Sequence, residues 1–422
     1  MAAEKGCAAV LCEDAPEGNI PYVRTDDSRL GLALAARNFY GDPSAEMKVI
    51  GITGTNGKTT TTILVKQILE KTLGAKVGLI GSISNMIGGE EFHAEHTTPE
   101  SCDLQALFRQ MADAGCTHCV MEVSSHSLVL HRVAGVHFAV GLFTNNTMEE
   151  YASAKSLLFP MCERAAANAD DPWTETVMNN APQPVYTFSA KSDDASLTAR
   201  DIRLAPSGVR FCALEQGELV RVKTNLPGQF SVYNALAAIA CARLLGVPLA
   251  DAAAALETSH GAKGRVEPVP TDGDYSIFID YAVTPDAIEN VLTTLRGIAP
   301  KRLVMLFGAG GDRDRKKRPI MGKLSADIAD FVIVTSDNPR TEDPMSIIEE
   351  ILPGVRAGKA PYKVICDRPE AIRWAIDHHE PGDVILLCGK GHEDYQIIGH
   401  EKIHMDEREI VADYLAERAK RT

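Results

Sequence analysis

The stretch 49-VIGITGTNGKTTTTILVKQIL-69 changes character twice over a short length. It begins as a β-branched apolar run, breaks into small residues around Gly54 and Gly57, and resumes with a helical pattern. A glycine turn between a buried strand and a helix lets backbone N–H groups approach an anion. The stretch therefore predicts a phosphate-binding loop at the edge of a sheet.

The match to a strict P-loop is incomplete. The pattern G-x-x-x-x-G-K-[ST] requires a first glycine where this sequence has Ile52. We still expect Lys58 to neutralise phosphate charge and the hydroxyl of Thr59 or Thr60 to reach Mg²⁺. A bare strand, turn and helix without a ligand is the structural alternative.

Length and composition describe an ordinary globular protein with more than one core. At 422 residues we expect two or three domains. No apolar run is long enough to cross a bilayer, and no signal peptide is recognisable at the start, so we expect no membrane insertion and a cytoplasmic protein. A net charge of −14 argues against nucleic acid as a partner. The ten cysteines are scattered and fit reduced thiols, including the Cys116 and Cys119 pair.

Strand-like runs alternate with helical patterns over most of the chain. Because this alternation is typical of parallel sheets covered by helices, it predicts an α/β fold. Between residues 191 and 229 an antiparallel meander is expected, then helices at 233–246 and 249–259, and a linker at 260–270 with a domain boundary near Ala262. The expected sheet strands are 47–53, 76–82, 117–125, 137–145, 275–282, 301–310, 330–338, 362–367 and 382–391.

Two further residues of the first half are candidates for the site. Glu122 ends a strand and would point into the same crevice, as a magnesium ligand or as a solvated carboxylate. Lys155 lies in 147-TMEEYASAKSLLF-159 on the stripe of a helix that includes Met148, Tyr151, Leu158 and Phe159. A lysine there must find a partner, extend to solvent or lose its charge.

Three loops in the last third follow successive strands. They are 308-GAGGDRDRKKRP-319, 335-TSDNPRTEDP-344 and 389-GKGHEDYQ-396. If they share one sheet edge, they form a mixed-charge site for a small zwitterion, whose carboxylates Arg313 and Arg340 could hold bidentately. Separate surface salt bridges are the alternative.

These segments together resemble the Mur ligase family, in matching order from Asp27 to the C-terminus. The motifs are DSR, NFYG, GTNGKTTT, TTPE, MEVSSHSL, YASAKSLLF, NADDP, LPGQFSVYNALAA, GRVEP, DYAVTPDA, GGDRDRKKRP, SDNPRTEDP and GKGHEDYQ. The resemblance implies a three-domain fold with a P-loop central parallel sheet and a Rossmann-like C-terminal domain. The expected domains are a shortened UDP-substrate domain (1–45), an ATP-binding domain (46–262) and an amino-acid domain (263–422).

The resemblance also implies an activity. The "DNPR" form is similar to that of members that add meso-diaminopimelate to UDP-N-acetylmuramoyl-L-alanyl-D-glutamate in peptidoglycan synthesis. ATP would phosphorylate the D-glutamate carboxylate, and the diaminopimelate amine would displace phosphate from the acyl phosphate. We expect a monomer that uses these small-molecule substrates.

Site roles follow from the resemblance, motif by motif. ATP would be bound by Gly54, Thr55, Asn56, Gly57, Lys58, Thr59, Thr60, Asn234 and Asp280. Magnesium would be held by Thr59, Glu122 and Lys155, the last as a carbamate formed with CO₂, and Lys58, Glu122 and Lys155 would be catalytic. The muramoyl dipeptide would meet Thr97, Thr98, Ser124 and Arg132, and the amino acid Arg313, Asp337, Asn338, Pro339, Arg340, Gly389 and Glu393.

Three departures from the family pattern stand out. A segment resembling L-S-x-D-H-L-D-x-H is missing after Asn145, and with it a magnesium-binding histidine. Val283 stands where the family has histidine near the nucleotide, and the N-terminal domain is shortened, without the usual uracil contacts. These losses leave open a catalytically impaired or non-catalytic ATP-binding paralogue. A ligase similar to folylpolyglutamate synthases is a further alternative, against which the "DNPR" and "GKGHEDYQ" loops argue.

Overall fold

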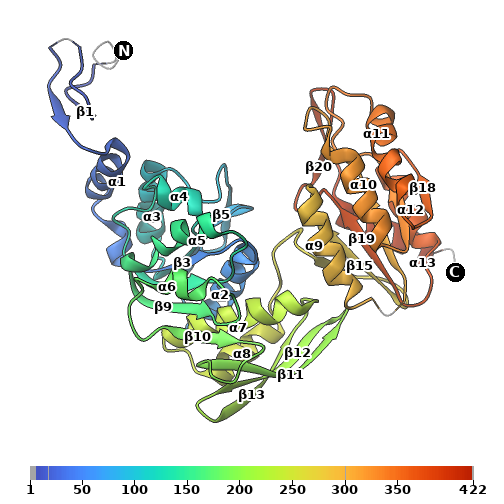
Figure 1. The fold of residues 1–422 in the computed structure, drawn as a ribbon, viewed down its shortest axis with the longest axis horizontal. Helices are drawn as coiled ribbons and strands as arrows, with labels where there is room; N and C mark the ends of the chain where they lie inside the picture. The colour runs from blue at the N-terminus through green and yellow to red at the C-terminus, as the bar shows by residue number, and fades with distance from the viewer. Residues whose placement is uncertain (1–5, 18, 300, 421–422) are drawn as a thin grey trace. The chain divides into compact units, whose positions relative to one another are not determined.

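The computed structural model describes residues 6–17, 19–299 and 301–420 (Figure 1). Residues 1–5 lie outside the described residues. They include part of the expected first domain and of the N-terminal stretch in which no signal peptide is expected. The chain divides into two compact units. Unit 1 comprises Met1–Asp201, Phe211–Lys223 and Val232–Ser259, and unit 2 comprises Ile202–Arg210, Thr224–Ser231 and His260–Thr422. The predicted domain boundaries after residues 45 and 262 stay predictions.

An 11-stranded mixed sheet organises the first part of the chain. Its centre is parallel, with β3 between β8 and β7, whereas β5 and β6 add antiparallel strands at one edge. At the other edge, β11, β12 and β13 follow one another as the expected meander. In spatial order the strands are β13 (Glu218–Thr224), β12 (Gly208–Glu215), β11 (Leu197–Ala205), β10 (Tyr186–Ser189), β9 (Cys162–Asn168), β8 (Phe138–Phe143), β3 (Lys48–Thr53), β7 (His118–Glu122), β4 (Val77–Ile80), β5 (Ser84–Ile87) and β6 (Glu90–His93).

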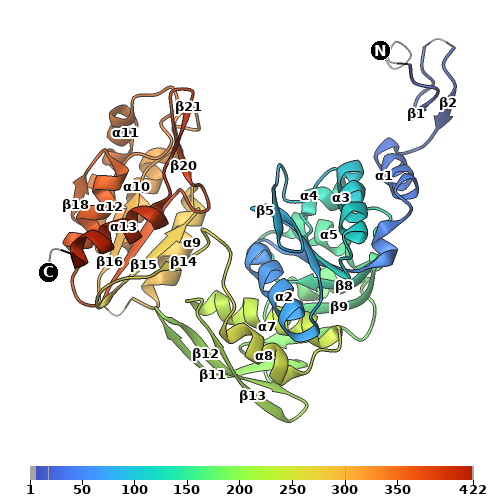
Figure 2. The same ribbon diagram turned by 180° about the vertical axis from the view of Figure 1, so that it is seen from behind.

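Helices cover this sheet because its central strands are apolar on both faces. Val49, Ile50 and Ile52 of β3 are all fully buried, and α2 packs on β3, β4 and β7 (Figure 2). The helices are α1 (Ser28–Phe39), α2 (Lys58–Leu73), α3 (Ser101–Asp113), α4 (Ser125–Val129), α5 (Glu149–Ser156), α6 (Thr174–Met178), α7 (Gln229–Leu244) and α8 (Leu249–Glu257), with 3₁₀ turns η2 (Pro43–Glu46) and η3 (Phe159–Met161). Before α1, β1 (Val10–Cys12) pairs in parallel with β2 (Tyr22–Arg24).

Unit 2 contains a six-stranded, mainly parallel sheet. After β15 the chain runs through β16, β17 and β18 in one direction across the sheet, and it then reverses direction to place β19 between β15 and β16. Ligands of open α/β sheets bind beyond the carboxyl ends of the strands at such a reversal. The strands in order are β14 (Glu267–Val269), β15 (Tyr275–Asp280), β19 (Asp383–Cys388), β16 (Leu303–Phe307), β17 (Phe331–Val334) and β18 (Tyr362–Val364), and a separate hairpin joins β20 (Tyr395–Ile398) to β21 (Glu401–His404).

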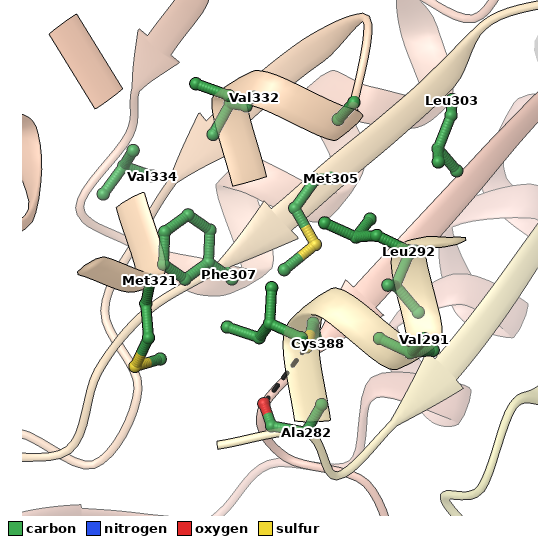
Figure 3. Close-up of a cluster of buried hydrophobic side chains, with 14 of the residues drawn as sticks. Ala282, Val291, Leu292, Leu303, Met305, Phe307, Met321, Val332, Val334 and Cys388 are labelled. Atoms are coloured by element: carbon green, nitrogen blue, oxygen red, sulfur yellow. Dashed lines mark hydrogen bonds between the residues drawn. The ribbon is translucent and has the colours of Figure 1, made fainter. Parts of the chain in front are cut away.

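Both faces of this second sheet are covered by helices, as the figures show from opposite sides (Figures 1 and 2). On one face Met305, Phe307 and Val334 belong to one buried apolar cluster with Val291 and Leu292 of α9, and Met305 lies beside Leu292 (Figure 3). On the other face a second apolar cluster joins the sheet to α12 and α13. The helices are α9 (Pro285–Arg296), α10 (Lys317–Ile328), α11 (Pro344–Ala357), α12 (Arg368–Asp377) and α13 (Glu407–Ala419).

The α/β fold with its two large sheets agrees with the sequence analysis, and two local predictions were wrong. The expected linker contains strand β14, which pairs antiparallel with β15. The expected apolar stripe beside Lys155 does not exist as one helical face: Met148 and Tyr151 are 52% and 46% exposed. Leu158 and Phe159 are buried, but they lie beyond the end of α5.

Within the described residues, no helix combines the length and the apolar character needed to span a membrane. All ten cysteines are free thiols. Cys116 and Cys119 are both buried in the core that packs against α3, which agrees with a structural role for this pair.

Candidate active site

The loop between β3 and α2 is shaped by two glycines. Gly54 has a φ of 152° and Gly57 a φ of 84°, backbone conformations that residues with a side chain rarely adopt. A Cβ at Gly54 would collide with Thr144 Oγ1, and one at Gly57 would collide with Asn234 Oδ1. The glycines therefore allow both the turn and the close approach of neighbouring elements.

A second loop braces this turn. Asn145, which follows β8, accepts hydrogen bonds from Thr55 N at its backbone oxygen (2.9 Å) and from Asn56 N at Oδ1 (2.9 Å). Its Nδ2 donates to Asn56 O (3.0 Å). The connection from β8 to α5 is only residues 144–148, so the residue that braces the phosphate-binding loop lies a few positions before α5.

Two lysines converge on the loop. Lys58 Nζ donates to Gly54 O (2.8 Å) and to Thr55 O (3.2 Å). Lys155 is 3% exposed, and its Nζ donates to Thr55 Oγ1 (3.0 Å) and to Asn146 Oδ1. Burial, reinforced by the Lys58 charge, lowers the pKa of Lys155 to about 8, although Asp171 opposes the shift. Both lysines therefore contact the loop.

Glu122 is the centre of a polar network at the end of β7. Its side chain is fully buried. Oε1 accepts from Ser82 N (2.8 Å), and Oε2 accepts from Ser82 Oγ (3.1 Å). Thr97 Oγ1 lies 3.0 Å from Ser82 Oγ, and Thr98 Oγ1 donates to Glu122 O (2.9 Å). A solvated carboxylate, the alternative for Glu122, is excluded by this burial.

The remaining residues expected to meet the peptide substrate join the same network. Ser124 N donates to Thr98 Oγ1 (3.2 Å), and Ser124 Oγ accepts from Ser127 N (3.1 Å) as the cap of α4. Arg132 donates to Thr98 O (3.0 Å) and pairs with Glu100 (2.5 Å). The structure therefore brings together the four residues that were expected to bind the peptide, namely Thr97, Thr98, Ser124 and Arg132.

No cluster of three or more His, Cys, Asp or Glu side chains suited to a metal occurs among the residues that the structure describes. Magnesium bound beside nucleotide phosphates usually takes only one or two carboxylates from the protein. The donors near the loop are of that kind: the Glu122 carboxylate and the hydroxyls of Thr59 and Thr60 in the first turn of α2. This donor set fits a phosphate-bound Mg²⁺.

In unit 2 the loops after β17 and β19 meet. Asn338 Nδ2 donates to Glu393 Oε2 (2.9 Å), and Lys390 Nζ donates to both Asn338 Oδ1 and Glu393 Oε2 (2.8 Å each). Asp337 is 6% exposed, and its buried Oδ2 has no hydrogen-bond partner. We call Asp337, Asn338, Arg340, Lys390 and Glu393 the carboxyl-edge cluster.

Glycines let the other loops approach this cluster. A Cβ at Gly389 would lie 2.6 Å from Asp337 Oδ2, and one at Gly310 would lie 3.0 Å from Arg340 Nη1 and 3.7 Å from Arg313 Cγ. Arg340 has a φ of 51°, which is uncommon for a residue with a side chain. Its Nη1 donates to Gly311 O (2.8 Å). The residues expected to bind the amino acid, including Pro339 in the same loop, are thus brought to one sheet edge.

The two residues expected near adenine and ribose are placed differently. Asn234 lies against the phosphate-binding loop, where its Oδ1 accepts from Thr61 Oγ1 (3.4 Å). Asp280 ends β15 in unit 2, and its carboxylate accepts from Val266 N (2.8 Å) and Ala282 N (2.9 Å). Burial raises the pKa of Asp280. Since the two residues belong to different units, their shared role stays a prediction.

A cavity of about 750 Å³ lies at the amino ends of β3 and β8. Lys48, Thr117, His137 and Glu163 are among its lining residues, and none of the predicted site residues lines it. Because the phosphate-binding loop follows the carboxyl end of β3, this cavity is not the candidate active site.

Sequence reasoning missed several residues of the two sites. Three of them, Asn145, Asn146 and Ser82, lie just after strands β8 and β4. The rule that ligands bind at the carboxyl ends of strands could have found Asn145. Lys390 lies in the predicted loop 389–396 but was not assigned to the site. Nothing in the local sequence marks Ser82 as the partner of Glu122, since they are 40 residues apart.

The fold and the two sites define the class of protein. It is an α/β P-loop protein with a buried lysine at the loop and, in a second α/β unit, a mixed-charge cluster at a sheet edge. The sequence model of the Mur ligase middle domain matches residues 52–242, and that of the Mur ligase, glutamate ligase domain matches residues 264–391. The chain belongs to the Mur ligase family.

Curated relatives carry more specific names. The chain is 47% identical to a UDP-N-acetylmuramoyl-L-alanyl-D-glutamate--2,6-diaminopimelate ligase of Caldanaerobacter subterraneus subsp. tengcongensis, over 99% of this chain and 89% of the relative. It is 42% identical to the ligase of the same name from Clostridium botulinum, over 98% of this chain and 88% of the relative.

Solved structures agree in fold. A UDP-N-acetylmuramoyl-L-alanyl-D-glutamate--2,6-diaminopimelate ligase superposes with a TM-score of 0.74 at 31% identity, over 97% of this chain and 87% of that one. A folylpolyglutamate synthase from Thermotoga maritima gives a TM-score of 0.66 at 20% identity, over 85% of this chain and 90% of that one. The second likeness concerns the fold alone.

Proposed function

We propose that the chain is an ATP-dependent ligase that adds meso-diaminopimelate to the D-glutamate carboxylate of UDP-N-acetylmuramoyl-L-alanyl-D-glutamate. A carboxylate resists amines because its oxygens are poor leaving groups. The γ-phosphoryl group of ATP first moves to a carboxylate oxygen, which gives an acyl phosphate and ADP. The substrate amine then attacks the acyl carbon, the amide forms, and inorganic phosphate leaves with the former carboxylate oxygen.

The observation that carries this proposal is the position of Lys155. A buried lysine with a pKa near 8, hydrogen-bonded to Thr55 of the phosphate-binding loop, is poorly stabilised as an ammonium. Its neutral amine can add to CO₂ and release one proton, which gives a carbamate anion. That reaction replaces a cation beside Lys58 with an anion that can bind magnesium, so it relieves the repulsion between the two side chains.

The chain's other residues take roles that follow from their positions. Lys58 and the N–H groups at the start of α2 bind phosphate oxygens. Thr59, Glu122 and carbamylated Lys155 would hold Mg²⁺, which would supply positive charge against the charge that develops on the phosphoryl group. Ser82 orients Glu122 by its two hydrogen bonds. Thr97, Thr98, Ser124 and Arg132 position the peptide that bears the reacting carboxylate.

The carboxyl-edge cluster supplies amino-acid specificity in this proposal. The unpartnered Asp337 Oδ2 and Glu393 attract the substrate's ammonium groups, and Arg313 and Arg340 attract its carboxylates. Diaminopimelate carries one more carboxylate than lysine. A site built to pair with that group rejects lysine, because lysine leaves a guanidinium without its partner.

Two departures from the family pattern, Val283 and the short connection after Asn145, concern residues close to those assigned above. Val283 cannot hydrogen-bond through its side chain, and its backbone oxygen accepts from Lys317 Nζ (2.8 Å). In the short connection after Asn145, Asn146 contacts Lys155 and its backbone N donates to Asp171 Oδ2 (3.0 Å). We propose that Asn146 and Asp171 orient Lys155 in place of the missing segment. The comparisons give no support to the non-catalytic alternative.

The test is phosphate release from ATP by the full chain with Mg²⁺. The proposal expects release only when both the UDP-muramoyl dipeptide and meso-diaminopimelate are present, and a large preference for diaminopimelate over lysine. Equal rates with the two amino acids would contradict the assigned specificity. ATP binding without release at any Mg²⁺ concentration would remove the proposal and favour a non-catalytic binder.

A further inference from the structure

Lys390 is the most deeply buried cation of the carboxyl-edge cluster. Its side chain has 0% exposure, so its ammonium is cut off from water. It pairs with Glu393 Oε2 at 2.8 Å, and its Nζ lies 5.2 Å from the centroid of the Tyr395 ring. Burying an ammonium is costly unless its partners are held in place, so the surrounding groups are organised around it.

The hydrogen bonds of Lys390 determine how Asn338 is oriented. Asn338 Oδ1 accepts from Lys390 Nζ (2.8 Å) and from Ile397 N (2.9 Å). With the oxygen occupied by two donors, the amide nitrogen is directed to Glu393 Oε2 (2.9 Å). An amide has one oxygen and one nitrogen end, so these contacts remove the alternative flipped orientation.

The same ammonium also fixes Glu393. Both Lys390 and Asn338 donate to its Oε2. The Glu393 N–H further donates to Lys390 O (3.0 Å), which closes a short turn between the two residues. The loop after β17 and the loop after β19 are therefore joined through one buried charge.

We propose that Lys390 is a positioning residue for amino-acid recognition: it sets the geometry of Asn338 and Glu393 without touching the substrate. The inference rests on the proposed function of the cluster and deepens it. If the bound amino acid depends on Asn338 and Glu393, loss of Lys390 weakens binding of that substrate and leaves ATP binding and the maximal rate nearly unchanged.

The experiment compares steady-state constants of the full-length enzyme. For Lys390→Met we expect KM for meso-diaminopimelate to rise about 10- to 100-fold, the range for losing a charge-assisted hydrogen bond. KM for ATP and kcat at saturating amino acid are expected to stay within about threefold of the wild type, because the phosphoryl-transfer groups are untouched.

Lys402→Met is the matched control. Lys402 Nζ also lies over the Tyr395 ring, 3.6 Å from its centroid, but Lys402 is exposed on β21. This variant removes a lysine of equal size and charge next to the same ring. We expect its KM for diaminopimelate to match that of the wild type.

A double-variant cycle separates positioning from general damage. Because part of the effect of Lys390 runs through Glu393, Lys390→Met combined with Glu393→Gln should raise KM by less than the product of the two single effects. The double variant removes both charges of the buried pair together. It can therefore be measured even if Lys390→Met alone does not fold, because no unpaired charge is left buried. Thermal unfolding of each variant checks this point.

Three results would overturn the inference: an unchanged KM in Lys390→Met, a fall in kcat with KM unchanged, or additive effects in the cycle. Its failure is distinguishable from failure of the proposed function. A wild-type enzyme that releases phosphate with diaminopimelate keeps the proposed function whatever the variants do, whereas an inactive wild type removes the function itself.

Discussion

At the scale of single residues, Lys155 carries the strongest chemical constraint. Its ammonium is buried, lies beside Lys58 and contacts the loop that we expect to bind phosphate. Two ammonium groups would repel Mg²⁺. The loop therefore becomes a favourable magnesium site only if Lys155 loses its positive charge.

The first prediction concerns CO₂. Carbamate forms from the neutral amine, whose population rises with pH and levels off above the pKa. With a pKa near 8, reactivation of CO₂-depleted enzyme at fixed CO₂ pressure should speed up until about pH 9 and then become constant. An unperturbed lysine would keep accelerating up to about pH 10.5. Phosphate release after a bicarbonate pulse measures the rate.

A substitution tests the same side chain. Lys155→Met should lower kcat by at least about 100-fold, because a charged group beside the transferring phosphoryl group is lost. Lys66→Met is the control. Lys66 is also a buried lysine, in α2, but its ammonium pairs with Glu70 at 2.5 Å and not with Thr55 or Asn146. Equal activity of the Lys155 variant and the wild type would contradict the proposed carbamate.

The sequence predicted the location of Lys155 and missed its surroundings. The resemblance assigned Lys155 to the site, whereas its neighbours in sequence left open a partner, solvent or loss of charge; the structure shows a buried side chain with hydrogen-bond partners. The predicted stripe was wrong because α5 ends at Ser156, so Leu158 and Phe159 reach the core from a turn. Helix ends depend on packing beyond the local pattern, and so do the hydrogen bonds of Lys155 with Thr55 and Asn146.

At the scale of elements, the turn between β3 and α2 depends on close approach. Gly57 combines positive φ with contact to Asn234 of α7. The strand, the turn and the helix were all predictable, because strand and helix periods differ and glycines mark the break. The position of Asn145 after β8 pointed to the same sheet edge, but its hydrogen bonds to Thr55 and Asn56 were not predictable, since these segments meet only in the folded sheet.

The third prediction is made for this turn. Gly57→Ala should destabilise the protein by about 1–3 kcal/mol and weaken ATP binding, because the new Cβ is strained and collides with Asn234. Gly74→Ala at the other end of α2 is the control. Gly74 also has positive φ, at 60°, but a Cβ there meets no atom within 4 Å. ATP titration and denaturant unfolding measure the two effects.

The control should lose only about 1 kcal/mol and bind ATP as the wild type does. If Gly57→Ala bound ATP normally, the turn would not be the nucleotide site, and the whole account of unit 1 would need revision.

At the scale of the whole molecule, unit 2 is held by an ion pair beneath its candidate site. Arg368 and Glu407 have fully buried side chains, with Arg368 Nε donating to Glu407 Oε1 (2.8 Å). Arg368 also donates to Ser336 O (3.3 Å) and Cys388 O (2.8 Å), the residues that precede Asp337 and Gly389. No local pattern in the sequence marks this long-range pair.

The fourth prediction follows from this burial. Arg368→Met leaves a buried carboxylate without its partner and should cost about 3–5 kcal/mol. Adding Glu407→Leu should restore most of that loss, since the unpaired charge is then removed. Because the chain has two compact units, hydrogen exchange should localise the loss of protection to unit 2. Equal loss over unit 1 would contradict the division of the chain.

The central claim is that one catalytic cycle couples ATP to amide formation through an acyl phosphate. The most direct measurement uses UDP-muramoyl dipeptide labelled with ¹⁸O in the D-glutamate side carboxylate, with ATP, Mg²⁺ and meso-diaminopimelate. Mass spectrometry of the released phosphate should find one ¹⁸O atom transferred from the substrate per turnover. Phosphate that carries no label would show that water, and not the carboxylate, attacks ATP, and the account would be wrong.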